Sequence, residues 1–273
     1  MIAMALIFSL TNMTDSPTGG LPHIEIGEID GRGPVSDAKA PSRAKENDLL
    51  ADKFRVPHLT DQHIPRPRLQ RRLRSSLNSI GAVLITGRAG SGKTALAADI
   101  ARSYASVVWY RVEAADSAWQ NFSGYLSEGI LKQNYESNVH SVSAFIEKIL
   151  SVPENTGRDP RLIILDDIHN VFDAEWFKEF FSTILFALPP LTHLIFLARS
   201  EPSFPLWRLR SKQVLAVFDE TLLMFDRAET EMLCSGHAHL IKEIPRLYSE
   251  SFGRIGKLRA LIASLSKNAD SPG

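Results

Sequence analysis

The chain has 273 residues, which is enough for one medium-sized domain with an appendage and a sizeable core. Its 31 basic and 31 acidic side chains cancel, so the net charge favours neither nucleic acid nor an anionic membrane as a partner. The sequence has one cysteine, Cys234, which excludes an internal disulfide framework and a cysteine-rich zinc site. A reducing, cytoplasmic setting is therefore expected.

The N-terminal region differs in composition from the rest of the chain. Residues 1–10 are apolar but carry no basic residue and are too short to span a bilayer. A true translation start at Met4 or Met13, downstream of Met1, explains these residues better than a weak signal peptide does. Residues 11–50 are rich in Ser, Thr, Pro, Gly and Asp, with no sustained apolar period. We predict a disordered leader over residues 1–51 and no membrane-spanning segment anywhere in the chain.

A basic segment follows the leader, over residues 53–74. It is compatible with a nucleic-acid patch, although a solvated start of a helix is the favoured interpretation. Pro65 and Pro67 hold the chain extended before a helix predicted over Arg68–Leu77.

A complete phosphate-loop motif, G-x-x-x-x-G-K-[ST], comes next. The β-branched run Ala82–Ile85 predicts a buried parallel strand, and Ala95–Ile100 is strongly helix-forming. Because strand, loop and helix stand in the order that the motif needs, a chance glycine-rich turn is disfavoured. The residues predicted to bind nucleotide are Gly87, Arg88, Ala89, Gly90, Ser91, Gly92, Lys93, Thr94 and Ala95.

The chemistry of this loop assigns roles to its residues. The glycines allow the backbone to approach an anion closely, and the helix N-terminus favours negative charge. Lys93 is expected to reach the β- and γ-phosphates, and the Thr94 hydroxyl is expected to ligate Mg²⁺.

Further strands and helices alternate along the rest of the chain. Strands are predicted over Val107–Val112, Arg161–Asp167, His193–Arg199 and Val214–Phe218, and helices over Ala118–Lys132, Ser141–Leu150, Trp176–Leu188, Ala228–Leu233 and Ile255–Leu265. This order predicts an α/β P-loop NTPase fold, with a five-stranded parallel sheet flanked by helices. We assign the P-loop domain to residues 52–225 and a partial helical subdomain to residues 226–268.

Charged residues end two of the predicted strands. Asp166 and Asp167 follow four apolar residues, as in a Walker B strand. We assign Asp166 to Mg²⁺ and Asp167 to the attacking water. Arg199 ends the next strand, where it could neutralise the γ-phosphate, with a surface salt-bridge role as the alternative. The predicted catalytic set is therefore Lys93, Asp167 and Arg199.

These motifs together resemble a known family. The chain is similar to the nucleotide-binding region of the STAND class of P-loop ATPases, in particular the MalT-type large transcriptional regulators. The segments that carry the resemblance are Ile64–Leu69, Gly87–Thr94, Trp109–Glu113, Leu165–His169, Ala198–Pro202 and Trp207–Arg210.

The resemblance implies a nucleotide switch that rests with ADP bound and assembles with ATP bound. It also implies that Ile64 and Arg66 lie beside the adenine. Family members carry a Gly followed closely by a Pro against the nucleotide, whereas the matching stretch here, Ser251–Gly256, has no proline. The expected ligands are ATP or ADP with Mg²⁺, and the expected partner is another protein or a further copy of the chain.

Two other functions compete with a slowly hydrolysing ATP switch. A small-molecule kinase is disfavoured because no basic lid with clustered arginines follows the acidic strand. A truncated, non-signalling remnant of a transcriptional regulator is the other alternative. With zero net charge and no helix-turn-helix pattern, we expect no sequence-specific DNA binding by this chain alone.

Overall fold

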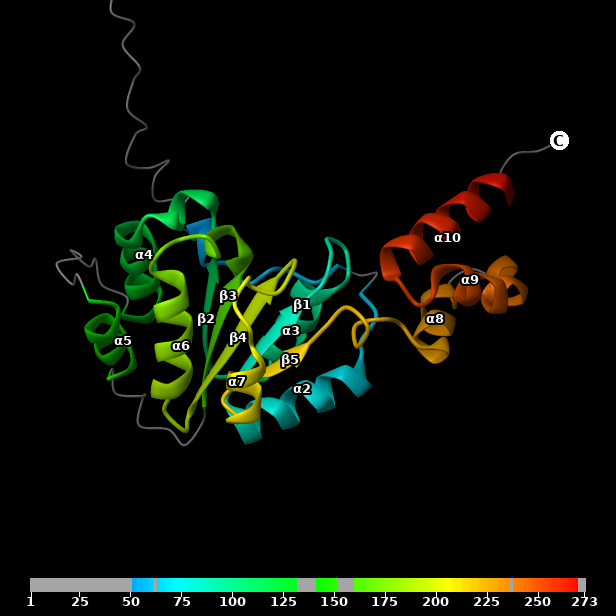
Figure 1. Ribbon diagram of the computed structural model, residues 1–273. Helices are drawn as coiled ribbons and strands as arrows, with labels where there is room; N and C mark the ends of the chain where they lie inside the picture. The colour runs from blue at the N-terminus through cyan, green and yellow to red at the C-terminus, as the bar shows by residue number, and fades with distance from the viewer. Residues whose placement is uncertain (1–50, 61–62, 132–140, 152–159, 236–237, 270–273) are drawn as a thin grey trace, which may run out of the picture. The chain divides into compact units, whose positions relative to one another are not determined.

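The computed structural model describes residues 51–60, 63–131, 141–151, 160–235 and 238–269 (Figure 1). All of them belong to one compact unit, residues 42–273. The predicted leader lies outside the described residues except for residue 51. Immediately after it, Lys53 donates hydrogen bonds to both carboxylate oxygens of the buried Asp116, at 2.8 and 2.9 Å, and so anchors the start of the described chain.

The central sheet has five strands that are all parallel, as the sequence predicts, in the order β2-β3-β4-β1-β5. Their bounds are β1 Ala82–Thr86, β2 Ser106–Arg111, β3 Arg161–Asp166, β4 Thr192–Ala198 and β5 Ala216–Phe218. From β1 the chain crosses to β2 at the sheet edge and then returns strand by strand to β4, which lies beside β1. Ligands of such sheets bind outside the carboxyl ends of the strands, where the strand order reverses.

Helices cover both faces of this sheet. Along β1, the side chains of Val83 and Ile85 pack in one apolar cluster, while Leu84 packs in a second one. The first cluster is completed by α2 and α3, and the second by α4, α5 and α6 (Figure 1). The near-continuous apolar strands therefore reflect burial on two faces, as expected for a parallel sheet.

The predicted helices are present with small shifts at their ends, and two short helices, α7 and α9, were not predicted. Their bounds are α2 Pro67–Ile80, α3 Lys93–Ala101, α4 Trp119–Leu131, α5 Val142–Leu150, α6 Phe177–Ala187, α7 Trp207–Ser211, α8 Arg227–Cys234, α9 Ile244–Ser251 and α10 Ile255–Ala269. Short 3-10 helices span Ala114–Ser117 (η1), Ile168–Val171 (η2) and Ala238–Glu243 (η3). The helix after the phosphate loop begins at Lys93, two residues before the predicted start.

The helices α8, α9 and α10 form a separate small core around Leu240, Leu247 and Leu258. The unpredicted α9 is an eight-residue helix whose buried apolar positions are Ile244 and Leu247. So short a helix is marginal by itself, and its stability comes from packing on its neighbours. In the described part of the chain, no helix is both long and apolar enough to cross a membrane.

Candidate nucleotide-binding site

The phosphate loop connects the end of β1 to the start of α3, as predicted. Gly90 and Gly92 have φ angles of +76° and +90°, a backbone region that favours glycine. A Cβ added at either position would meet nothing within 4 Å, so the space beside the loop backbone is open. The loop therefore presents its main chain at the N-terminus of α3, the arrangement that binds anions.

Lys93 is buried and folds back over its own loop. Its Nζ atom donates hydrogen bonds to the carbonyl oxygens of Gly87 and Arg88, the latter at 3.0 Å. Burial lowers the pKa of the Lys93 ammonium from its usual value, and the nearby charges of Asp166 and Asp167 oppose that effect. The ammonium group is thus held at the loop with acidic groups close by.

Asp166 and Asp167 diverge at the end of β3. Asp166 is buried and its Oδ1 atom accepts a hydrogen bond from the backbone N–H of Asp167 at 3.0 Å. Burial, together with the like charge of Asp167, raises the pKa of Asp166 to about 6. Asp167 has left-handed backbone angles, φ 55° and ψ 32°, so the chain turns sharply between the two carboxylates. Asp tolerates this conformation better than most residues do.

Arg199 is brought beside the phosphate loop by the register of β1 and β4. Thr86 pairs with Ala198, and the N–H of Gly87 donates to the Ala198 carbonyl oxygen at 3.2 Å. Arg199 comes directly after this pair. Its positive charge contributes to lowering the pKa of Lys93. Lys93 of the phosphate loop and the three strand-end residues Asp166, Asp167 and Arg199 therefore lie at one edge of the sheet.

His169 also faces this cluster, although the sequence analysis assigned it no role. Its Nδ1 atom lies 3.8 Å from Oδ1 of Asp167 and is a buried atom without a hydrogen-bond partner. Burial lowers the pKa of His169, Asp167 opposes this, and Arg199 and Lys93 add to the lowering. The neutral imidazole is therefore favoured beside Asp167.

A cavity of about 230 Å³ adjoins the phosphate loop and the first turns of α3. Thr94 and Ala95 line it on the phosphate side, and the predicted base contacts Ile64 and Arg66 line it as well. The remaining lining residues are His63, Gly90, Gly92, Lys93, Leu96, Asp99, Phe225, Ile255 and Arg259.

The guanidinium of Arg66 has other partners than a base. It donates to the carbonyl oxygens of Leu223 and Met224 at 2.7 and 2.8 Å and to both carboxylate oxygens of Glu229. If Arg66 contacts a base, it therefore does so through its aliphatic carbons or its backbone. The assignment of Ile64 and Arg66 as base contacts stays a prediction.

Residues from the helical subdomain line this cavity and were not predicted as site residues. They are Ile255 and Arg259 of α10. Phe225, which lies just before α8, also lines the cavity. The apolar period of α10 signals only that one face is buried. Which residues turn toward the loop depends on the packing of α10 and could not be read from that period.

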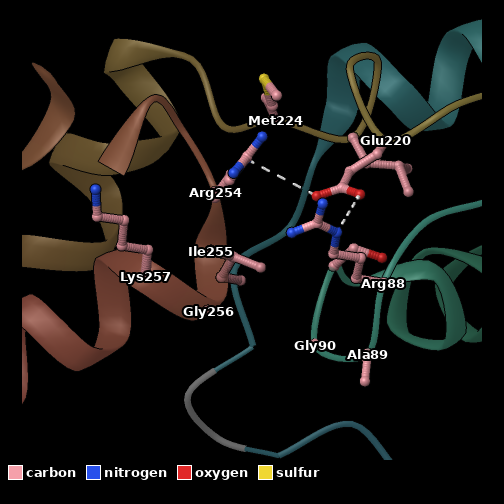
Figure 2. Close-up of a pocket in the computed structure, with 11 residues that line it drawn as sticks. Arg88, Ala89, Gly90, Glu220, Met224, Arg254, Ile255, Gly256 and Lys257 are labelled. Carbon is pink, nitrogen blue, oxygen red and sulfur yellow. Dashed lines mark ion pairs between the residues drawn. The ribbon is translucent and has the colours of Figure 1, made fainter. Parts of the chain in front are cut away.

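A second cavity, of about 240 Å³, adjoins the first one, since Gly90 and Ile255 line both. In Figure 2, Arg88 of the phosphate loop and Arg254 from the start of α10 both point toward Glu220. The Nε atoms of the two arginines lie 3.7 and 3.9 Å from the Glu220 carboxylate. One acidic residue thus stands between the loop and the helical subdomain.

The proline-free stretch Ser251–Gly256 forms the turn between α9 and α10. Gly253 has a φ of +69°, and its carbonyl oxygen accepts a hydrogen bond from the N–H of Phe225 at 2.7 Å. A Cβ on Gly253 would lie 2.3 Å from the Phe225 carbonyl oxygen, so a glycine is required there. Ile255 and Gly256, directly after this turn, line the second cavity.

The donor set is suited to a magnesium–nucleotide complex. The Thr94 hydroxyl and the Asp166 carboxylate carry oxygen atoms, the kind of donor that Mg²⁺ prefers. Among the described residues, no group of three or more His, Cys, Asp and Glu residues could hold a metal ion by itself.

One protein family and one curated relative match parts of this chain. Residues 77–198 match the family described as "AAA domain". The HTH-type transcriptional regulator MalT of Vibrio cholerae is 27% identical over 162 residues, which are 54% of this chain and 17% of that protein. The chain therefore matches only about a sixth of the length of this relative.

Two solved structures are similar to this chain to different extents. A Drosophila ORC structure, bound to DNA, is 10% identical, with a TM-score of 0.50 over 89% of this chain and 66% of that one. A STAND protein with a tetratricopeptide repeat sensor from Pyrococcus horikoshii is 18% identical, with a TM-score of 0.45 over 73% of this chain and 30% of that one. Residues 77–198 thus match an AAA domain, and the chain is similar over 162 residues to the transcriptional regulator MalT.

Proposed function

We propose that this chain is an ATP-binding, slowly hydrolysing switch module of a regulatory protein, which signals through a protein partner or through self-assembly. The observation that carries the proposal is the composition of the cavity beside Lys93. It is lined by the phosphate loop on one side and by the helical subdomain, through Ile255 and Arg259, on the other.

The proposal gives separate roles to the side chains that bind the phosphates and to those that act on hydrolysis. Lys93 exchanges its contacts with the Gly87 and Arg88 carbonyl oxygens for phosphate oxygens, and so keeps its hydrogen bonds while gaining a charge partner. Thr94 and Asp166 hold Mg²⁺, which when bound neutralises charge on the phosphates.

The remaining residues act on the hydrolytic step. Asp167, turned away from Asp166 by its left-handed backbone, orients the attacking water. Arg199 stabilises negative charge that develops at the γ-phosphate position. His169, close to Asp167, restricts the orientations available to that carboxylate.

A switch requires a ligand that interacts differently with two conformations. Lining of the cavity by residues of two substructures supports such a difference. A nucleotide in contact with both Lys93 and Arg259 favours the arrangement in which the helical subdomain packs on the loop. The length of the phosphate chain then sets how strongly that arrangement is favoured, which supports discrimination between ADP and ATP.

Calorimetry with magnesium–ATP tests the proposal. Lys93→Ala removes the cation at the loop and is expected to weaken binding by at least tenfold, since charge-assisted hydrogen bonds contribute about 1.5–3 kcal/mol each. Lys242→Ala, which removes the same charge from an exposed position in η3, is the matched control and should bind like wild type. Equal affinity of wild type and Lys93→Ala would contradict the assignment of the loop.

The regulatory part of the proposal needs a separate readout. Limited proteolysis of wild type should cut the region of α8–α10 at different rates with ADP and with ATP. Identical cleavage patterns in the two nucleotides, at concentrations that saturate binding, would leave a nucleotide-binding domain without a switch.

A further inference from the structure

A groove far from the chemistry of the phosphate loop lies between α6 and the segment 204–212, which includes α7. It encloses about 390 Å³. Its apolar lining comes from Phe186 on α6 and from Phe204, Pro205 and Leu209 across from it. The groove shares no lining residue with the two cavities beside the phosphate loop. It is referred to below as the α6–α7 groove.

The polar part of the lining is cationic. Lys178 comes from α6, and Arg208 and Lys212 come from α7 and its C-terminal cap. No carboxylate lines the groove. Within the described part of the chain, none of these three side chains forms a salt bridge. Three positive charges therefore surround an apolar floor without internal compensation.

Two large aromatic side chains of this region are exposed: Phe186 lines the groove, and Trp207 precedes the lining residue Arg208 in the sequence. Phe186 is 56% exposed and lies under the Lys212 ammonium, whose Nζ atom is 5.3 Å from the ring centroid. Trp207 is 61% exposed, with the Arg208 guanidinium 5.2 Å from its ring. Exposed aromatic surface next to an apolar hollow is a feature of binding surfaces rather than of ordinary solvent-facing helices.

The spacing along α6 indicates the shape of the occupant. Lys178, Ser182 and Phe186 recur every four residues, so they form one row on the helix surface. Eight residues of helix correspond to about 12 Å, roughly two turns. A hollow of this length, apolar at its floor and walled by two helices, suits a short amphipathic helix laid along it.

We propose that the α6–α7 groove binds an amphipathic helix of a partner protein, whose apolar face meets Phe186, Phe204 and Leu209. The groove charges determine the flanks of that helix. Asp or Glu residues on either side of the apolar stripe pair with Lys178 on one wall and with Arg208 and Lys212 on the other. The same three cations repel a helix whose flanks carry Lys or Arg.

The position of the groove relates it to the nucleotide site. The segment 204–212 belongs to the connection between β4 and β5, and Arg199 starts that connection next to the phosphate loop. A helix held against α7 therefore contacts the same connection that carries the arginine at the γ-phosphate position. This part of the inference rests on the proposed function, whereas binding of the helix itself does not.

Fluorescence anisotropy with the full chain tests the proposal. The probe is a labelled 14-residue helical peptide with Leu at positions i, i+3, i+4 and i+7 and Glu on both flanks. One comparison peptide replaces each Glu by Lys, and a second is a scrambled sequence of the same composition. The Glu peptide is expected to bind at least tenfold tighter than either one, with an affinity that falls as salt rises.

Variants locate the binding on the groove. Lys178→Glu combined with Arg208→Glu should weaken binding of the Glu peptide at least tenfold and improve binding of the Lys peptide. Phe186→Ser should weaken both. The matched control is Arg210→Glu, which makes the same charge change on α7 at an exposed residue outside the groove lining. Hydrogen exchange should slow in residues 178–186 and 204–212 when the Glu peptide is bound.

Three results would overturn the proposal. The first is equal affinity for the Glu and scrambled peptides. The second is an equal loss of binding in Arg210→Glu and in the double variant. The third is a wild-type dimer, seen by light scattering, that excludes the peptide and that the double variant abolishes. The last result would assign the groove to a second copy of the chain. Calorimetry with magnesium–ATP on the double variant keeps this test separate from the proposed function, because none of these residues lines the nucleotide cavity.

Discussion

Arg66 and Glu229 form a buried ion pair across 163 positions of sequence, with Nη2 and Oε2 2.8 Å apart and both side chains only 6% exposed. The guanidinium also stacks over the Phe225 ring at 4.4 Å. Glu229 in turn accepts a hydrogen bond from the N–H of Asp226, which closes the N-terminal capping box of α8. One arginine just before α2 therefore holds the start of the helical subdomain.

Arg66→Ala is expected to loosen α8–α10 from the P-loop domain. Removing one partner of a buried pair typically costs about 3–5 kcal/mol, because the other charge is left without compensation. Hydrogen exchange in residues 226–235 and 244–269 should accelerate, while exchange in the sheet should change little.

Arg68→Ala is the matched control for this variant. Arg68 also reaches Asp226 at 3.2 Å and lies 3.6 Å from Glu229, but its side chain is 44% exposed, and such exposed pairs contribute only about 0–1 kcal/mol, so its loss should accelerate exchange much less. Equal exchange in Arg66→Ala and wild type would show that the pair does not hold the subdomain.

Asp166→Asn is expected to stabilise the nucleotide-free and magnesium-free protein. Folding raises the pKa of Asp166 from 3.8 to about 6, so the native chain binds this proton more tightly than the unfolded chain. The ionised carboxylate therefore costs native stability above about pH 6, by about 3 kcal/mol at most, and the cost fades as pH falls toward 3.8. Asn resembles the protonated acid and carries no such cost.

Thermal melts at two pH values measure this effect. The melting temperature of Asp166→Asn should exceed that of wild type by several degrees at pH 7.5, and the gap should shrink to about a third at pH 4.5. Asp173→Asn, at an exposed position after η2, serves as the control. A wild type more stable than Asp166→Asn at pH 7.5 would mean that partners of the carboxylate outweigh its burial.

Asp167→Asn is expected to separate binding from hydrolysis. Asn also tolerates the left-handed backbone of this position, so the turn at the end of β3 should persist. ATP binding should survive, because Lys93 and the loop hold the phosphates. Single-turnover hydrolysis should fall by roughly tenfold to a thousandfold, the scale typical of losing a positioned charged group.

Magnesium titration distinguishes the two aspartates. Asp166→Asn should weaken the magnesium dependence of ATP binding, whereas Asp167→Asn should leave it intact. If Asp167→Asn hydrolyses ATP at the wild-type rate, Asp167 has no part in the mechanism.

The chain is expected to show no sequence-specific DNA binding. Arg66, which belongs to the basic segment, is buried in its pair with Glu229 and is unavailable, which leaves exposed residues such as Arg71, Arg72 and Arg74 on α2. A few phosphate contacts give only weak association that falls steeply with salt. Retention of one particular duplex over random competitor at physiological salt would contradict this prediction.

The local motifs of this chain could be predicted from its sequence. The loop Gly87–Thr94, the acid pair Asp166–Asp167 and the arginine after β4 are each encoded by a few consecutive residues next to an apolar strand. Parallel strands present their carboxyl ends at one edge, so the gathering of these groups followed from the α/β alternation alone. The match of residues 77–198 to an AAA domain agrees with the predicted P-loop fold.

Contacts between distant segments were decided only in the tertiary structure. The sequence pattern predicted α10 as an amphipathic helix but could not place Ile255 and Arg259 beside the phosphate loop, or turn the Arg66 guanidinium to Glu229. It gave no sign that Lys178, Arg208 and Lys212 border one groove. A periodic pattern specifies which face of a helix is buried, whereas the partner of that face depends on how the separately encoded elements pack against one another.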